Sequence, residues 1–265
     1  MHNCSKILLA GILVLPFGLE ARPAIFPSEP LPPPHTRLQL ERPINISYTE
    51  FPPYTYTDSQ GVAHGYFVDL IKQMLDQLQV NYRFAANPTP RIHYQLKSGE
   101  LDVYLGPRGV PNLAKHTRMI PLPESFSIKL SLWRRPGTRN IPEVMALQGQ
   151  NLAIINGFGY GGLITQLNNN DHGIHIIRAS GHDTALKMLI SRRVDYLLDY
   201  QRPVSIELKK HLNAELLHQP IQNIHVAFIV SRYVPHSKAL YEALLRLVES
   251  HFSNTAIPAA LNSPP

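Results

Sequence analysis

The sequence predicts an α/β fold that contains two units of similar build. Strand-like and helix-like segments alternate in each half of the chain. The two halves also share a short cassette, which reads LKSGELD at residues 96–102 and LISRRVD at residues 189–195. Each copy combines a helix end, a tight turn and a buried strand that opens with Asp. This alternation favours a mostly parallel sheet flanked by helices in each unit.

The first half contains the predicted elements of a β-α-β-α-β unit. Residues 67–78 place apolar side chains at a 3.6-residue period, which predicts an amphipathic helix. A second helix is predicted over Arg91–Lys97, because Ser98 and Gly99 follow as a stop signal. The predicted strands are Ile44–Tyr48, Val80–Phe84 and Leu101–Leu105.

The second half repeats this order and then adds two elements. The predicted strands are Leu152–Ile155, Ile174–Arg178 and Val194–Leu198, and the predicted helices are Leu163–Leu167 and Asp183–Ile190. A late strand over His225–Ser231 and an amphipathic helix over Ser237–Phe252 follow.

The N-terminal region has the layout of an export signal. A short segment with Lys6 precedes an apolar run over residues 7–19, and Ala21 offers a small residue for cleavage. We therefore predict a signal peptide over residues 1–21, with an uncleaved membrane anchor as the alternative. Residues 22–43 are rich in proline and predict an extended spacer. We expect an exported, soluble protein.

Composition excludes several classes of function. The 265 residues carry 25 Lys and Arg against 19 Asp and Glu, with 13 His and one Cys. One Cys excludes a disulfide framework, and the histidines do not fall at metal-ligand spacing, so we expect no metal site. The basic runs, such as Lys209-Lys210-His211, are short, which argues against a nucleic-acid partner.

Several motifs taken in order resemble one known family. They are FPPY at residues 51–54, GYFVDL at 65–70, the cassette at 96–102, LQGQNLA at 147–153, RVD at 193–195 and the strand at 225–231. The chain resembles the bacterial periplasmic solute-binding proteins of the polar amino acid type, family 3. The resemblance implies a type II periplasmic-binding-protein fold with two lobes and two hinge crossings. Lobe 1 would span residues 44–132 and 228–261, and lobe 2 would span residues 135–227.

The resemblance also implies a function. Such proteins close around a small polar solute, here an amino acid or a related carboxylate, and present it to the membrane permease of an ABC-type transporter. We expect a monomer that carries no cofactor and performs no chemistry. Two alternatives remain: an enzyme similar to cyclohexadienyl dehydratases, with Glu124 or Asp199 as the acid, and an accessory protein that senses a ligand for a membrane partner.

In lobe 1 we expect four ligand-binding residues. Phe51 stands where the family stacks an aromatic ring on the ligand, and Tyr54 lies close behind it; packing alone is the alternative for both. Gly106 and Arg108 lie on the loop after the third strand. The family's carboxylate-binding Arg is replaced by Leu113, so we hypothesise that Arg108 binds the anion instead, with a surface loop arginine as the alternative.

In lobe 2 the matched loop follows the strand at residues 152–155. Gly157, Phe158, Gly159 and Tyr160 stand where family members carry hydroxyl side chains at a helix N-terminus. Backbone N–H groups would bind an anion there, or the two rings would line an apolar pocket. The loop also spells G-x-G-x-x-G, but the first strand–helix unit lacks this dinucleotide motif and no acidic partner follows, so we expect no NAD.

One further ligand-binding residue is expected at the end of the strand over residues 194–198. The resemblance implies an Asp near this point that pairs with the ligand's amino group. Asp199 lies close to it, although a spacing difference of one residue leaves Tyr200 and Gln201 as alternatives. A solvent-exposed capping role is the other interpretation of Asp199.

Overall fold

The computed structural model describes residues 38, 40–108, 112–169 and 172–253. The predicted signal peptide, most of the proline-rich spacer, Gly109 and the end of the predicted lobe 1 therefore lie outside the described residues. Among those described, no helix has the length and apolar character needed to cross a membrane.

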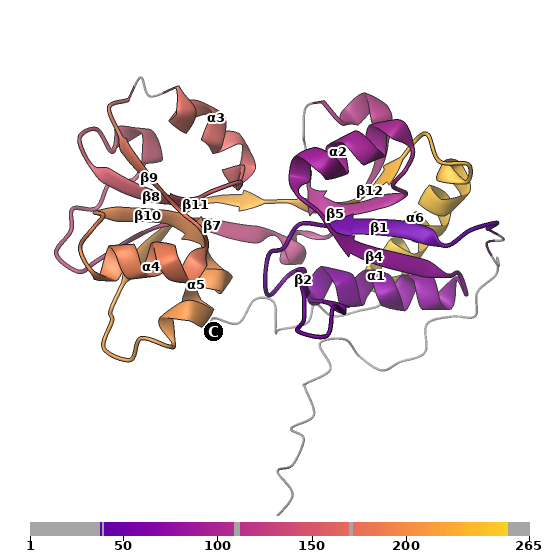
Figure 1. Ribbon diagram of the computed structural model, residues 1–265, viewed down its shortest axis with the longest axis horizontal. Coiled ribbons are helices and arrows are strands. Elements are labelled where there is room, and N and C mark those ends of the chain that lie inside the picture. Colours follow the sequence, from indigo (N-terminus) through magenta and orange to yellow (C-terminus); the bar gives the residue numbers. More distant parts are fainter. Residues whose placement is uncertain (1–37, 39, 109–111, 170–171, 254–265) are drawn as a thin grey trace, which may run out of the picture. The chain divides into compact units, whose positions relative to one another are not determined.

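The first sheet has five strands (Figure 1). In spatial order they are β4 (Tyr82–Ala86), β1 (Ile44–Tyr48), β5 (Val103–Pro107), β12 (Val226–Ser231) and β6 (Thr117–Pro121). β1 pairs in parallel with β4 and β5, whereas β12 is antiparallel to β5 and β6. The accompanying helices are α1 (Tyr66–Gln77), α2 (Thr89–Ser98) and α6 (Ser237–Ser253). The predicted apolar stripe of α1 is buried, from Phe67 to Leu75.

The second sheet also has five strands. In spatial order they are β11 (Leu217–Ile224), β7 (Ile128–Arg134), β10 (Tyr196–Tyr200), β8 (Asn151–Ile155) and β9 (His175–Ala179). β8 is parallel to β9 and β10, and β7 is antiparallel to β10 and β11. The accompanying helices are α3 (Leu163–Asn168), α4 (His182–Ile190) and α5 (Gln201–Leu208). Trp133, Leu186 and Leu197 lie in the buried core of this half.

Smaller elements complete the chain. They are the hairpin β2 (Tyr56–Thr57) with β3 (Ala63–His64), and the 3-10 turns η1 (Ala114–His116), η2 (Glu124–Phe126), η3 (Val144–Ala146) and η4 (Tyr160–Gly162).

The chain passes between the two sheets twice. The first crossing, residues 122–127, joins β6 to β7, and the second passes through His225 between β11 and β12. The predicted α/β class with two sheets is confirmed, and the sheets are mixed because the strands next to the crossings run antiparallel. The lobe limits expected at Leu132 and Phe228 stay predictions. The chain enters the second sheet at Ile128 and returns to the first sheet at Val226, a few residues before those limits.

The shared cassette makes equivalent contacts in the two halves. In the first, the Asn45 N–H donates to Asp102 Oδ2 at 2.8 Å and the Asp102 N–H donates to the Asn45 carbonyl at 3.1 Å. In the second, the Asn151 N–H donates to Asp195 Oδ2 and the Asp195 N–H donates to the Asn151 carbonyl, both at 2.9 Å. Each Asp thus ties the turn before its strand to the neighbouring parallel strand, β1 or β8.

Candidate functional site

Four rings from both halves of the chain meet at one place, which we call the aromatic shell: Phe51, Phe158, His182 and Tyr200. The ring centre of Phe51 lies 4.8 Å from that of Tyr200, 5.4 Å from that of Phe158 and 5.9 Å from that of His182. Phe51 follows β1, Phe158 follows β8, His182 opens α4 after β9, and Tyr200 ends β10. All four therefore lie past or at the carboxyl ends of parallel strands, where α/β sheets place their ligands.

Further tyrosines support the shell from behind. Tyr54 stacks on Phe51 at 5.2 Å and on Phe67 at 5.3 Å, and Tyr160 stacks on Tyr200 at 5.7 Å. Burial raises the pKa of Tyr54, Tyr160 and Tyr200, so their hydroxyls stay neutral at any physiological pH. The tyrosines that support the shell are therefore uncharged.

The loop after β8 is held by Tyr160. This residue is fully buried at a φ of 50°, and its hydroxyl accepts the Ile155 N–H at 2.5 Å. Gly157 and Gly159 lie exposed beside it, with open space where a Cβ would stand. Of the four residues predicted on this loop, Phe158 and Tyr160 therefore join or support the shell. An anion-binding role for the two glycines stays a prediction.

Asp199 lies behind the shell and is wholly buried. Its Oδ2 is 2.8 Å from His182 Nδ1, and its Oδ1 accepts the Tyr200 N–H at 2.7 Å. Burial raises the pKa of Asp199, and the hydrogen bond and charge of His182 oppose that rise. The alternative of a solvent-exposed cap is wrong for Asp199, because the residue has no exposed surface.

The residues predicted on the first-half loop lie apart from this arrangement. Gly106 is part of β5, where a Cβ would stand 2.2 Å from the Tyr104 ring, so close packing requires glycine there. Arg108 is exposed, and its backbone N–H donates to the His225 carbonyl at 2.8 Å. Leu113 is buried among the apolar residues of the first half. Ligand binding by Gly106 and Arg108 stays a prediction, and among the described residues no contact joins either side chain to the shell.

Sequence reasoning missed two residues of this region, His182 and Arg202. His182 lies in the shell itself. Arg202, in the first turn of α5, lies over the ring of Tyr66 at 4.6 Å and donates to the Tyr66 hydroxyl. Tyr66 in turn lies 6.0 Å from Tyr54, so a second contact between the two halves adjoins the shell. Their places in the sequence offered a signal, because His182 follows β9 and Arg202 follows β10, and both strands pair in parallel with β8.

Glu124, the other acid considered for an enzymatic role, lies on the first chain crossing. It is exposed, and its carboxylate pairs with His225 Nδ1 at 2.8 Å and with Asn223 Nδ2 at 3.2 Å. His225 forms the second crossing, and Asn223 lies at the end of β11 just before it. Glu124 therefore links the two crossings to each other rather than contributing an acid to the aromatic shell.

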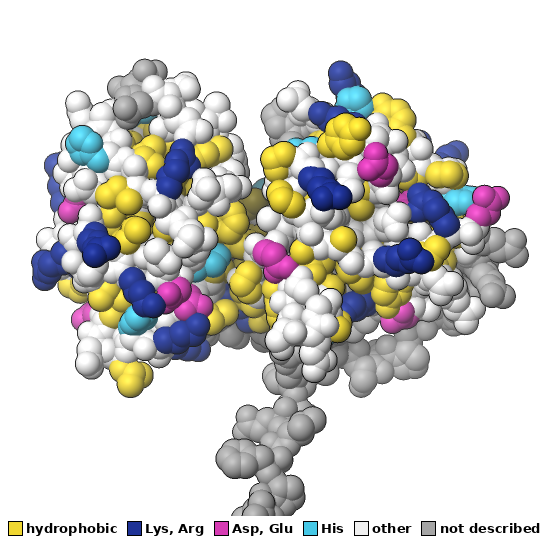
Figure 2. Space-filling view, viewed as in Figure 1, with side chains coloured by type: hydrophobic (Ala, Val, Ile, Leu, Met, Phe, Trp, Pro, Cys, Tyr) yellow, Lys and Arg dark blue, Asp and Glu magenta, His cyan; other side chains and the backbone are white. Residues whose placement is uncertain are grey.

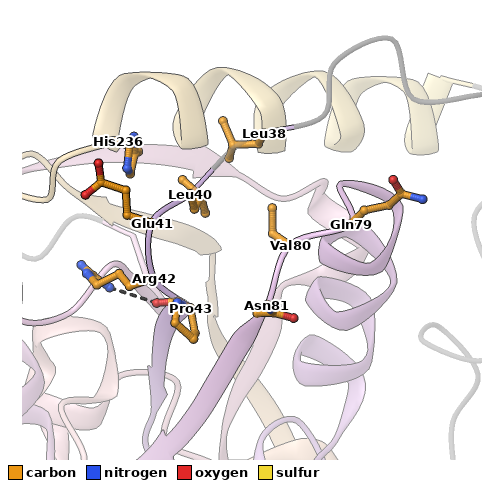
Figure 3. Close-up of a pocket in the computed structure, with 9 residues that line it drawn as sticks. All are labelled: Leu38, Leu40, Glu41, Arg42, Pro43, Gln79, Val80, Asn81 and His236. Carbon is orange, nitrogen blue, oxygen red and sulfur yellow. Dashed lines mark hydrogen bonds between the residues drawn. The ribbon is translucent and has the colours of Figure 1, made fainter.

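A cavity of about 610 Å³ lies elsewhere in the first half (Figure 3). Its lining residues are Leu38, Leu40, Glu41, Arg42, Pro43, Gln79, Val80, Asn81 and His236. Arg42 forms an ion pair with Asp102 at 2.6 Å. This cavity adjoins the amino end of β1, whereas α/β sheets hold ligands at the carboxyl ends of their strands. We therefore place the candidate site at the aromatic shell.

Charge and metal-ligating groups do not point to another kind of site. Figure 2 shows Lys and Arg side chains spread over the face in view rather than gathered in one patch. Within the described ranges, no group of three or more His, Cys, Asp or Glu residues is placed to hold a metal ion.

Part of the chain matches the model of a known family. Residues 44–110 match the model of the bacterial extracellular solute-binding proteins, family 3. No curated protein sequence matches the chain.

Solved structures share the fold along most of the chain. An ancestral arginine-binding protein bound to arginine is 18% identical, with a TM-score of 0.63, over 82% of this chain and 95% of its own. A histidine kinase sensor domain with similarity to periplasmic binding proteins is 18% identical, with a TM-score of 0.65, over 83% and 94%. The arginine-, lysine-, histidine-binding protein ArtJ from Geobacillus stearothermophilus is 15% identical, with a TM-score of 0.60, over 84% and 100%. The resemblance to the bacterial extracellular solute-binding proteins of family 3 is thus confirmed, in sequence over residues 44–110 and in fold over the greater part of the chain.

Proposed function

We propose that the protein captures a small polar solute, an amino acid or a related carboxylate, at the aromatic shell. One observation carries the proposal: Phe51 comes from the first half of the chain, and the other three rings of the shell come from the second. A solute held there would contact both halves, which are joined by two short crossings. Its binding energy would therefore favour the closed arrangement, as in hinge-closing proteins generally.

The family match and the amino-acid-binding structural neighbours support this class of solute. On the same grounds we propose export through the signal peptide at residues 1–21 and residence in the periplasm. The protein would act there as a monomer without a cofactor and deliver its solute to the permease of an ABC-type transporter. Ligand binding is expected at Phe51, Tyr54, Phe158, Tyr160 and Asp199, and at the loops that carry Gly106, Arg108, Gly157 and Gly159.

The test is a thermal-shift screen of residues 22–265 against amino acids, polyamines, dicarboxylates and aromatic acids, followed by titration calorimetry of every solute that responds. A solute present at 100 times its Kd should add about 2.7 kcal/mol to the free energy of unfolding. Recovery of the solute unchanged would support capture. Formation of a product would support the dehydratase-like alternative. Neighbouring genes for a permease and an ATPase would favour transport over the sensory alternative.

The variant Phe158→Ala should raise the Kd of such a solute by roughly tenfold or more, because it removes a ring face of the shell. Tyr94→Ala is the matched control, since Tyr94 is an aromatic residue that is 66% exposed and distant in the chain from every shell residue. Equal affinities of the two variants for the solute would contradict the placement of the site.

A further inference from the structure

His182 carries a polar atom that the folded chain leaves without a partner. Its Nε2 is buried and makes no hydrogen bond to any of the described residues. The side chain as a whole is 12% exposed, and its ring faces Phe51 at 5.9 Å and Phe158 at 5.6 Å. A buried polar atom that lacks a partner is costly, so an atom in this position marks a place where a further group completes the bonding.

The other nitrogen of the same ring fixes what Nε2 offers. Nδ1 lies 2.8 Å from Asp199 Oδ2, and an ionised carboxylate only accepts hydrogen bonds. With Asp199 ionised, the imidazole proton is therefore held on Nδ1. A neutral imidazole in this tautomer presents a lone pair at Nε2, which accepts a hydrogen bond from an N–H group.

The surroundings of Nε2 also favour a positive partner. The faces of Phe51, Phe158 and Tyr200 carry the negative side of the ring quadrupole, which attracts ammonium groups. Asp199 adds a buried carboxylate behind the imidazole. The remaining charged residues of α4, Asp183 and Lys187, pair with each other at 2.7 Å on the exposed side of that helix.

We propose that His182 Nε2 accepts a hydrogen bond from an ammonium or other N–H group of the captured solute, with Asp199 as the positioning residue that sets the tautomer. This assignment rests on the proposed function and specifies its solute as an amine with an apolar or ring-bearing body. The solute enters when the two halves move apart, because Phe51 occupies the space among the other rings in this structure.

Three probes separate the possible polar contacts: phenethylamine, 3-phenylpropanoate and L-phenylalanine. All three carry a phenyl ring, like the Phe51 ring that packs against the other rings of the shell. Phenethylamine adds an ammonium group, 3-phenylpropanoate a carboxylate, and L-phenylalanine both. Titration calorimetry with the full mature chain at pH 7.5 should show phenethylamine and L-phenylalanine binding at least about tenfold more tightly than 3-phenylpropanoate. A preference for 3-phenylpropanoate would overturn the assignment.

Two variants of His182 separate the roles of its nitrogens. In His182→Asn the amide takes the place of Nδ1 and keeps Asp199 partnered, but nothing remains at Nε2. In His182→Gln the longer side chain restores an acceptor near Nε2. We expect His182→Asn to weaken phenethylamine by about tenfold or more and His182→Gln to weaken it less. Equal affinities for wild type and His182→Asn would overturn the assignment.

Imidazole nitrogen NMR gives a readout that a purely structural role would not change. The spectrum of the wild type should show protonated Nδ1 and a lone pair at Nε2, and phenethylamine should shift the Nε2 resonance. Asp199→Asn should alter the tautomer. A proton on Nε2 in the free protein would overturn the assignment. If no solute of the wider screen binds, the proposed function itself is overturned. If a solute binds equally well without His182, only the assignment of His182 is overturned.

Discussion

The variant His182→Ala should lower the free energy of unfolding at pH 7 by roughly 3 to 5 kcal/mol, because it removes the partner of a fully buried carboxylate. Among the described residues, the Asp199 carboxylate would then keep one donor, the Tyr200 N–H at 2.7 Å. The expected loss is large because a buried charge without its partner costs far more than the pair contributes.

The loss should depend on pH with a definite sign. Burial raises the pKa of Asp199 in the folded protein, and removing His182 removes an influence that lowers it. Below about pH 3.9, the usual pKa of an Asp, this carboxyl is protonated in the folded and unfolded states alike, and the variant should approach the wild type. As the pH rises through the raised folded pKa, stability is lost, so the deficit should grow towards neutral pH.

Urea unfolding followed by circular dichroism from pH 3.5 to 8 measures this effect. The matched control is His64→Ala, which removes a histidine that also pairs with an aspartate, Asp58, at 3.0 Å, but in a setting where both side chains are about 30% exposed. That variant should change stability little, since exposed ion pairs contribute little. The double variant His182→Ala with Asp199→Asn should recover much of the loss. A deficit that stays constant with pH would contradict the buried-charge explanation.

The variant Gly65→Ala should lower the free energy of unfolding by at least about 2 kcal/mol and the Tm by roughly 5 °C or more. Gly65 has a φ of 116° and a ψ of 165°, a region that essentially only glycine adopts. A Cβ there would stand 2.4 Å from the Tyr54 carbonyl oxygen and 2.8 Å from that of Pro53. Backbone atoms cannot swing aside as a flexible side chain does, so the turn that carries Phe51 would have to shift.

Differential scanning calorimetry checks this, with Gly61→Ala as the control. Gly61 also has a positive φ, 80°, but no atom lies within 4 Å of its Cβ position. The difference between the two variants therefore reports the close approach of Tyr54 and Pro53 rather than the sign of φ alone. Gly65→Ala should also weaken solute binding, because Phe51 and Tyr54 belong to the displaced turn. A smaller loss for Gly65→Ala than for Gly61→Ala would contradict the argument.

The apolar patterns were sufficient to predict several helices and strands, but β6 and the buried strand β7 were not among them. The helix expected over residues 67–78 is α1, and the shared cassette marks the same contacts in both halves. β11 escaped prediction because it is largely exposed, and its register shifts at Pro220. α5 escaped because Pro203 near its start resembles a breaker, although proline is tolerated in a first helical turn.

The candidate site was predictable in part. Phe51, Phe158 and Tyr160 follow strands in a recognisable order, and the structure brings them together. His182 and Arg202 depend on which strand ends become neighbours in the sheet, and a single sequence does not contain the strand order. The burial of Asp199 could not be predicted either, because a polar residue at a strand end can be an exposed cap or a buried residue.

The place of β12 in the middle of the first sheet sets an order of events during synthesis. β12 lies between β5 and β6, yet it leaves the ribosome only after the whole of the second sheet, which is complete at Ile224. The second half is therefore a continuous segment, and all its strands are made before the first half is complete. Until β12 is made, β6 lacks the strand with which it pairs in the first sheet. A nascent chain stopped before residue 226 would carry a finished second sheet and an unfinished first one, with β5 and β6 as open edges exposed to chaperones and to other chains.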